Sequence, residues 1–408
     1  MTITRRALVG SAAALSTLPI IRARAQSRPL IRVGVLTDLS GTYRDNTGPM
    51  SVLCSRQAAE EFNAGAHGFD VEVLEADHQN KPDNASTIAR QWFDQGVDVV
   101  ADVPTSSVAL AVAQVAKEKD KIMLNASATS TALTDSQCSP NTIVWSFDTY
   151  MMAVSQGGTV VKQGGKDWFF ITADYAFGHI LEEQTAQLVI AAGGKVLGAL
   201  RYPFPDTTDF SAYLQQAAAS GAKVLGLANA GGDTVNSIKQ AHEFGVNKSM
   251  TIVPLLIFTT DVHALGLDVA EGLYCTNSFY WNRTDGTRAF TKRVTAKSGT
   301  KYPNMAHASS YSSVLHYLKT VAAMGPAEAK KSGRATVARM KAMPVEDDCF
   351  GKTTIREDGR NLTPAFLFEV KKPSESKGPW DYYKLVVSTP GDQAYRPLAD
   401  GHCPLVKS

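Results

Sequence analysis

Hydroxyl side chains gather where two apolar runs of the sequence give way to helical patterns. Thr105 and Ser106 lie in the stretch PTSS after the run VDVVADV, and Ser127 and Thr129 lie in NASATST after the run KIML. Ser and Thr before a helix are more often N-caps than ligand contacts. Hydroxyls and the free N–H groups of a helix start also suit a carboxylate. Both interpretations, a helix cap and one side of an anion site, remain open at this point.

Three later turns add aromatic rings, an amide and a carboxylate. Tyr175 and Phe177 lie in ADYAFGH, Asn229 and Asp233 in NAGGD, and Phe258 in LLIFTTD. The rings suit an apolar or aromatic ligand body, although ordinary loop packing is an alternative for Tyr175 and Phe177. Asp233 could instead cap the helix that follows it. A binding role is favoured because both groups of turns follow predicted strands.

Motifs for catalysis and metal binding are missing from the sequence. There is no GxSxG nucleophile elbow, no HExxH among the eight histidines, and no CxxC pair among the five cysteines. The stretch VVKQGGKDW contains Gly and Lys but lacks the spacing of a phosphate-binding loop. We therefore predict a protein that is not an enzyme and that has no metal site and no cofactor.

Strand and helix patterns alternate from residue 30 and start again at residue 167. Runs such as LIRVGVLT and DWFFITA are strand-like, and the helical patterns between them stop at glycines such as Gly65 and Gly193. This alternation is typical of parallel sheets with helices on both faces. We predict an α/β fold of two doubly wound parallel-sheet lobes joined by strand crossovers. Ligands bind beyond the carboxyl ends of such strands, so the two groups of turns would share one cleft.

Each predicted lobe is made of two separate stretches of the chain. We assign residues 28–146 and 275–348 to lobe 1, and residues 147–274 and 349–408, which include the C-terminal tail, to lobe 2. No low-complexity linker separates the two units. The chain is therefore expected to cross between the lobes in ordered strands.

The first 25 residues are typical of a cleaved export signal. Arg5 and Arg6 precede a mildly apolar run, and the small-residue pattern ARA ends at Ala25. The paired arginines and the weak hydrophobicity indicate the twin-arginine route. Cleavage after about Ala25 removes four arginines and no acid, which leaves 37 basic against 39 acidic residues and a net charge of −2. Such a protein has no electrostatic support for nucleic-acid binding, and no later stretch predicts a transmembrane helix.

The chain resembles the type I periplasmic binding proteins of ABC importers, in the leucine/isoleucine/valine-binding branch. The resemblance covers nearly all of residues 28–408 and is carried by RVGVLTDLSGTY, EADHQNKPD, WFFITADYAFGH, GLANAGGDTVNSIKQAHEFG, FTTDVHALGL, SYSSVLHYLKTV and VKKPSESKGPWDYYKLV. It implies a monomeric periplasmic receptor whose lobes close on a small carboxylate and which docks on a membrane permease. A ligand sensor with the same fold is the alternative function.

The resemblance also implies which residues contact the ligand. Hydroxyls of the PTSS and NASATST turns would hold the carboxylate, an aromatic ring of ADYAFGH would close over the ligand, and a tyrosine of a late helix would add a further contact. Together with the turns described above, the expected contacts are Tyr43, Thr105, Ser106, Ser127, Thr129, Tyr175, Phe177, Asn229, Asp233, Phe258, Tyr280 and Tyr311.

One position departs from the amino-acid-binding members of this family. Those members hold the ligand's ammonium with a carboxylate just after a strand of the second lobe, where this chain has Leu256, Ile257 and Phe258. An ammonium buried without a counter-charge is strongly unfavourable, and Asp233 is the one candidate substitute. The ligand is therefore expected to be a carboxylate without the amine, either aromatic or a short oxo acid, with a branched-chain amino-acid-like ligand as the remaining possibility.

An odd number of cysteines allows one or two disulfides in an oxidising compartment and leaves at least one thiol unpaired. The cysteines are Cys54, Cys138, Cys275, Cys349 and Cys403. The resemblance implies a bridge between Cys138 and Cys403, because relatives often carry cysteines at both positions. Such a bridge would pin the C-terminal tail.

Overall fold

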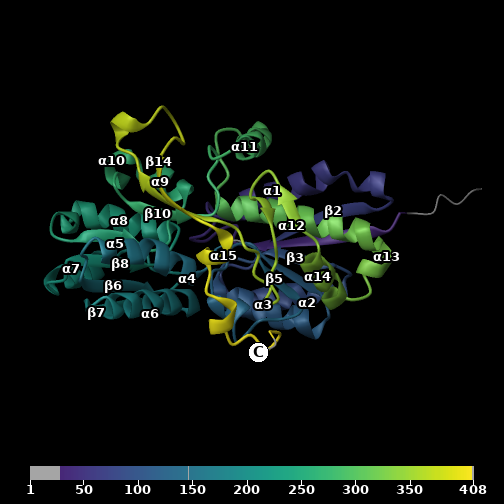
Figure 1. Ribbon diagram of the computed structural model, residues 1–408, viewed down its shortest axis with the longest axis horizontal. Coiled ribbons are helices and arrows are strands. Elements are labelled where there is room, and N and C mark those ends of the chain that lie inside the picture. Colours follow the sequence, from purple (N-terminus) through teal and green to yellow (C-terminus); the bar gives the residue numbers. More distant parts are fainter. Residues whose placement is uncertain (1–27, 146, 407–408) are drawn as a thin grey trace, which may run out of the picture.

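The computed structural model describes residues 28–145 and 147–406, so the predicted export signal at residues 1–25 lies outside the described part of the chain. Two lobes lie side by side along the long axis of the molecule, the early part of the chain in one and the middle part in the other (Figure 1). Each lobe is built on its own sheet, and late segments of the chain return to both.

The first lobe contains a five-stranded parallel sheet in the order β2-β1-β3-β4-β5. Its strands are β1 (Leu30–Thr37), β2 (Asp70–Asp77), β3 (Val99–Asp102), β4 (Ile122–Asn125) and β5 (Thr142–Val144). Its helices are α1 (Gly48–Phe62), α2 (Pro82–Asp94), α3 (Ser106–Glu118), α11 (Asp285–Ser298), α12 (Met305–Met324), α13 (Pro326–Ala329) and α14 (Gly333–Ala342). α1 and α12 pack together against one face of the sheet, while α2 and α3 pack together against the other.

The second lobe repeats this plan with a four-stranded parallel sheet in the order β7-β6-β8-β9. Its strands are β6 (Asp167–Ala173), β7 (Lys195–Tyr202), β8 (Val224–Ala228) and β9 (Thr251–Pro254). Its helices are α4 (Thr149–Met152), α5 (Gly158–Lys162), α6 (Ala176–Ala191), α7 (Ser211–Ala219), α8 (Gly232–Glu243), α9 (Thr259–Leu265) and α10 (Leu267–Ala270). The predicted α/β fold with two doubly wound parallel sheets is thereby confirmed.

The apolar runs of the sequence become the central strands because both of their faces are covered. β3, β4 and β8 are buried along their whole length, as expected for parallel strands between two layers of helices. In each lobe the chain reverses its direction of winding at the first strand, between β1 and β3 and between β6 and β8. Such switch points leave a crevice at the carboxyl ends of the two strands.

Segments late in the chain bridge the lobes and form two small antiparallel sheets. One contains β10 (Tyr274–Asn277), β13 (Ala365–Val370) and β14 (Tyr383–Thr389), and the other β11 (Val345–Asp347) and β12 (Gly351–Thr353). A buried ion pair of 2.8 Å joins Arg360 to Asp148 at the crossover between β5 and α4. Either charge buried without its partner would be strongly unfavourable. The two residues therefore depend on each other at this position.

The C-terminal tail after β14 contains α15 (Gly391–Ala394) and returns to the first lobe. Cys403 forms a disulfide with Cys138, with 5.6 Å between the Cα atoms, so this predicted bridge is confirmed. Arg396 adds an ion pair of 3.1 Å to Asp135. The remaining cysteines, Cys54, Cys275 and Cys349, are buried free thiols.

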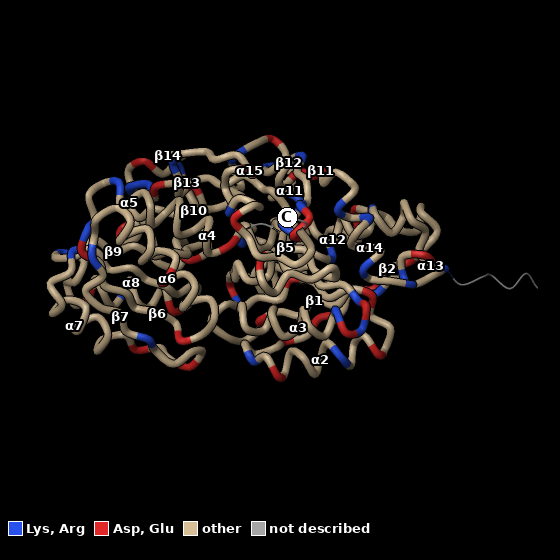
Figure 2. Tube along the Cα trace, turned by 60° about the horizontal axis from the view of Figure 1, so that its bottom comes forward, with Lys and Arg blue, Asp and Glu red and all other residues tan. Residues whose placement is uncertain are grey.

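Positions of positively and negatively charged residues are scattered along the chain in both lobes (Figure 2). Among the helices that the structure describes, none has both the length and the apolar character that crossing a bilayer requires.

Candidate ligand-binding site

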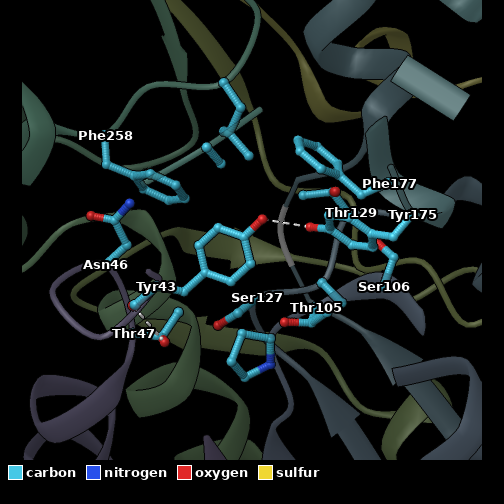
Figure 3. A pocket seen from close by; sticks show the side chains of 14 residues that line it. Tyr43, Asn46, Thr47, Thr105, Ser106, Ser127, Thr129, Tyr175, Phe177 and Phe258 are labelled. Carbon is cyan, nitrogen blue, oxygen red and sulfur yellow. Dashed lines mark hydrogen bonds between the residues drawn. The ribbon is translucent and has the colours of Figure 1, made fainter. Parts of the chain in front are cut away.

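A small cavity lies between the two lobes, at the carboxyl ends of their central strands. Its lining residues are Tyr43, Asn46, Thr47, Pro104, Thr105, Ser106, Ser127, Ala128, Thr129, Tyr175, Phe177, Ala230, Leu256 and Phe258 (Figure 3). The cavity volume is about 30 Å³, which is room for one or two water molecules. The lobes therefore have to separate before a larger molecule can enter.

The turn after β3 holds an unusual backbone at the edge of this cavity. Asp102, Val103 and Thr105 all have positive φ angles, of 74°, 56° and 74°. Left-handed conformations are rare for residues other than glycine and persist only where the surroundings hold them, often at functional sites. This strained turn places the start of α3 at the wall of the cavity.

Thr105 precedes α3 as its N-cap residue, yet its side chain makes no capping hydrogen bond. Its hydroxyl instead donates a short hydrogen bond to Asn80 Oδ1, and Asn80 Nδ2 donates to Asp38 Oδ2 at 2.7 Å. The simple cap interpretation of this hydroxyl is therefore wrong. Because its proton is committed to Asn80, Thr105 offers mainly an acceptor to the cavity.

Ser106 is the first residue of α3 and a polar residue of the cavity wall. Its side chain is 1% exposed, and its hydroxyl has no hydrogen-bond partner within the described structure. A buried polar group without a partner is unfavourable by about 1–3 kcal/mol. The N–H groups of a helix start also lack carbonyl partners and attract negative charge. Ser106 thus offers the cavity an unused hydroxyl beside the free N–H groups of a helix start.

The second lobe supplies an aromatic wall. Tyr175 stacks on Phe204 with 4.3 Å between ring centroids and lies 5.7 Å from Phe177. Across the cavity the Tyr43 and Tyr175 hydroxyls are hydrogen-bonded at 2.6 Å, which Figure 3 shows as a link between the lobes. Burial raises the pKa of both phenols well above the usual value, so both rings stay neutral.

The charge of the cavity wall is zero, because none of its lining residues carries a charge. Leu256 and Phe258 line the wall in the stretch where amino-acid binders were expected to carry an acid. Among the residues that the structure describes, His, Cys, Asp and Glu side chains also form no cluster of three or more that could hold a metal ion.

Four of the expected contact residues lie outside the cavity. Asn229 is one position from the lining residue Ala230, and its amide is bonded within α8 to Ser237 and Thr234. Asp233 Oδ1 accepts from Thr42 at 2.8 Å and its Oδ2 from Tyr202 at 2.8 Å. Asp233 is therefore not positioned as a substitute acid inside the cavity.

The other two are aromatic residues that pack elsewhere. The Tyr280 hydroxyl donates to the carbonyl of Trp380 at 2.8 Å, within the core beside β10 and β14. The Tyr311 hydroxyl bonds Glu61 of α1, and its ring packs 4.7 Å from Phe290 of α11. Neither ring reaches the cavity, because α12 presents Tyr311 to its neighbouring helices and Tyr280 is held in the second-lobe core.

The remaining eight expected residues line the cavity together with six that were not singled out. These six are Asn46, Thr47, Pro104, Ala128, Ala230 and Leu256. Four of them, Pro104, Ala128, Ala230 and Leu256, lie inside turns that the sequence analysis names, and Asn46 and Thr47 follow Tyr43 in the loop after β1. Selection of whole turns rather than of polar and aromatic residues would have included them.

Hydrogen bonds hold the two lobes together around the cavity. Thr42 accepts from the Gly232 backbone N–H at 3.0 Å, and Thr260 donates to Asn46 Oδ1 at 2.6 Å. Asp261 accepts from Asn46 at 3.4 Å. Burial raises the pKa of Asp233 to about 6 and that of Asp261 to about 7. Because the hydrogen bonds of Thr42 and Asn46 join the two lobes, the structure represents the closed arrangement of the lobes.

A second cavity of about 470 Å³ lies on the other side of Asn46. Its wall includes Arg44, Asp45, Asp261 and Lys301, so it is charged where the first cavity is neutral. The first cavity is the better candidate for a specific site, because the switch-point turns of both lobes converge there.

Comparison with known proteins places this geometry in a family. A family model described as periplasmic binding protein matches residues 30–378. A solved periplasmic binding protein of Burkholderia mallei is 46% identical, with a TM-score of 0.88, and the match covers 92% of this chain and 99% of that one. A branched chain amino acid ABC transporter periplasmic ligand-binding protein of Burkholderia xenovorans is 36% identical, with a TM-score of 0.78 and the same two coverages.

More distant matches agree with this placement. The Leu/Ile/Val-binding protein homolog 6 of Brucella melitensis is 27% identical over 243 residues, which is 58% of this chain and 61% of that relative. The matched part of the chain thus spans less than two thirds of that relative's length. A Rhodopseudomonas palustris solute binding protein solved with benzoate shares the fold, at 19% identity and a TM-score of 0.77, over 88% of this chain and 97% of that one. The expected resemblance is thereby confirmed: the chain belongs to the periplasmic binding protein family, whose members bind ligands and are not enzymes.

Proposed function

We propose that this protein is the solute receptor of an ABC importer and traps a small carboxylate that lacks an amine between its lobes. It would be exported to the periplasm, with its signal removed after about Ala25, and would deliver the ligand as a monomer to a membrane permease. The observation that carries the proposal is the buried, unpaired hydroxyl of Ser106 at the start of α3. It faces a cavity without charge, in which an anion finds donors and no acid.

The carboxylate would be held by the first lobe. Ser106 and the N–H groups of the first turn of α3 would donate to its oxygens. Thr105, Ser127 and Thr129 line the same side of the cavity, where the Thr105 hydroxyl donates to Asn80 and would not donate to the ligand. The positive end of the α3 dipole favours the same orientation.

The rest of the ligand would lie against the aromatic rings. Tyr43, Tyr175, Phe177 and Phe258 form an apolar surface, with phenol groups at two positions. An ammonium group would be buried there without a counter-charge, which disfavours leucine, isoleucine and valine. Aromatic acids fit this wall, and structures of Rhodopseudomonas palustris proteins with the same fold carry benzoate and 4-hydroxybenzoate. The 36% identical Burkholderia xenovorans protein is named for branched-chain amino acids. Leucine, isoleucine and valine are therefore included among the ligands to be tested.

A thermal-shift screen followed by calorimetry tests the proposal. Benzoate, hydroxybenzoates and short oxo acids are compared with leucine, isoleucine and valine, and benzyl alcohol serves as a control without a carboxylate. A ligand at 100 times its Kd stabilises a protein by about 2.7 kcal/mol, so a true ligand raises the melting temperature measurably. Aromatic or oxo acids should lead the ranking. A ranking led by leucine, isoleucine or valine would contradict the proposed ligand class.

A ligand sensor that feeds a receptor or regulator is the second candidate function, because the same closing cleft can signal as well as deliver. Reconstituted permease and ATPase distinguish the two. Ligand uptake into vesicles that depends on this protein supports import, and its absence with intact ligand binding favours sensing.

A further inference from the structure

A buried carboxylate lies directly behind the proposed carboxylate seat. Asp102 is the last residue of β3, is 0% exposed and has a φ of 74°. Its Oδ1 accepts a short hydrogen bond from the Ser127 hydroxyl and a second one, of 3.3 Å, from Ser310 of α12. Its Oδ2 has no hydrogen-bond partner within the described structure. Nothing in the binding mode described above uses this acid.

The direction of the hydrogen bond to Ser127 depends on the charge of Asp102. An ionised carboxylate only accepts hydrogen bonds, so the Ser127 proton then points away from the cavity and only lone pairs of Ser127 face the ligand. A protonated Asp102 can donate its own O–H to Ser127. The Ser127 hydroxyl is then free to donate to an oxygen of the ligand.

Within the described part of the chain, the groups that act on Asp102 include no cation. They are hydroxyls of Thr37 on β1, Ser51 on α1, Ser127 after β4 and Ser310 on α12. Asp102 in turn acts on Cys54 of α1, and burial raises the pKa of that thiol so that it stays neutral. Burial raises the pKa of Asp102 to about 6, with the four hydroxyls acting in the opposite direction. A ligand carboxylate in front of Ser127 would place a second negative charge next to the first.

We infer that Asp102 couples ligand binding to proton uptake: a carboxylate enters the seat together with one proton, which Asp102 takes and which turns the Ser127 hydroxyl toward the ligand. Asp102 thus acts as a positioning residue that selects anions only in its protonated state. The inference rests on the proposed function, because it needs a carboxylate in this seat.

The sign of the pH dependence follows from the charges. The bound anion favours the protonated form, so the pKa of Asp102 is higher in the complex than in the free protein. Affinity should be greatest below about pH 6, the pKa of Asp102 in the closed structure without ligand, down to the pH at which the ligand itself becomes protonated. Above pH 6 it should fall by up to tenfold per pH unit. Proton uptake should be small at pH 5 and approach one per ligand at pH 7.5.

Calorimetry in two buffers of different ionisation enthalpy measures this uptake directly. The probe is the aromatic or oxo acid with the strongest binding in the screen. Asp102→Asn keeps a donor toward Ser127, and Asn tolerates a left-handed backbone. This variant should bind at pH 8 as tightly as the wild type binds at pH 5, without proton uptake.

Asp233 provides the matched control, because its pKa is also raised but it lies in the contact between the lobes. Closure of the lobes buries Asp233 and Asp261 and raises their pKa values, so these two groups can take up protons of their own. The double variant Asp233→Asn with Asp261→Asn removes that part and should keep the proton uptake that depends on Asp102. Tight carboxylate binding without uptake by this double variant, or uptake that persists when Asp102→Asn is added to it, would overturn the inference. Failure of every carboxylate to bind at any pH would instead overturn the proposed function.

Infrared difference spectra of the wild type cover the case in which Asp102→Asn does not fold. At pH 7.5, binding of the same acid should produce the C=O band of a newly protonated buried carboxylic acid. Saturation with ligand without such a band would contradict proton uptake by Asp102.

Discussion

Ser106 combines deep burial with an unused hydrogen-bond donor, and this combination distinguishes it from its neighbours. Ser107 follows it in the same turn of α3 but lines no part of the cavity. The two serines therefore allow a comparison in which residue type, helix and substitution are identical. They differ in their position relative to the cavity, and Ser107 is also less buried than Ser106.

Ser106→Ala should weaken carboxylate binding by about ten- to a hundredfold, because a hydrogen bond to a charged group contributes about 1.5–3 kcal/mol. The fold should not be destabilised and should gain up to about 1–3 kcal/mol, since the variant removes a buried hydroxyl that has no protein partner. Calorimetry gives the affinity and denaturant unfolding gives the stability. Ser107→Ala should leave the affinity within twofold, and an equal loss in both variants would show that the effect is not specific to the seat.

Four of the expected contacts follow strands of the first lobe and line the cavity, whereas Tyr311, whose direction a helix face decides, packs elsewhere. Thr105, Ser106, Ser127 and Thr129 line the cavity because the carboxyl ends of β3 and β4 are adjacent in the sheet. Tyr311 sits in the middle of α12, which is buried on nearly every side. Its direction depends on the packing of α12 against α1 and α11, which no local pattern reveals.

At the level of elements, the starts of α3 and α6 approach the cavity from opposite lobes. Ser106 opens α3, and Phe177 lies in the first turn of α6. The alternation of strands and helices in the sequence predicted both helices, because each follows a buried strand. It could not predict the strained backbone of residues 102–105, since positive φ angles there depend on the tertiary contacts that hold them.

The C-terminal tail is the element whose position depends most on a single covalent bond. Cys138 and Cys403 are separated by 265 residues, and a loop of this length loses much conformational entropy when it is closed in the unfolded chain. Cys138→Ser combined with Cys403→Ser should lower the free energy of unfolding by about 2–4 kcal/mol. Denaturant unfolding with and without reductant measures this loss.

The three buried thiols supply the control for that experiment, because they remain in the double variant. Reductant should lower the stability of the wild type to that of the double variant and should leave the double variant unchanged. Equal stability of oxidised and reduced wild type would contradict a stabilising role for the bridge.

At the level of the whole molecule, function depends on how closely the lobes can approach. A backbone contact joins the loop after β1 to the start of α8, where the Gly232 N–H donates to the Thr42 carbonyl at 3.0 Å. Gly231 makes this approach possible. A Cβ atom at this position would lie 2.6 Å from the Thr42 carbonyl oxygen, which is closer than atoms can pack.

Gly231→Ala should therefore hold the lobes apart and lower ligand affinity at least tenfold, while each lobe keeps its fold. Gly221→Ala is the matched control, because Gly221 also has a positive φ, of 80°, but no atom within 4 Å of the added Cβ. Both variants place alanine at a positive φ, and the strain is greater at Gly231, whose ψ of −137° lies outside the left-handed helical region. Only Gly231→Ala also blocks the approach to Thr42. Small-angle scattering should show compaction on ligand addition in the wild type and in Gly221→Ala. Compaction and full affinity in Gly231→Ala would mean that binding does not require the closed contact between Thr42 and α8.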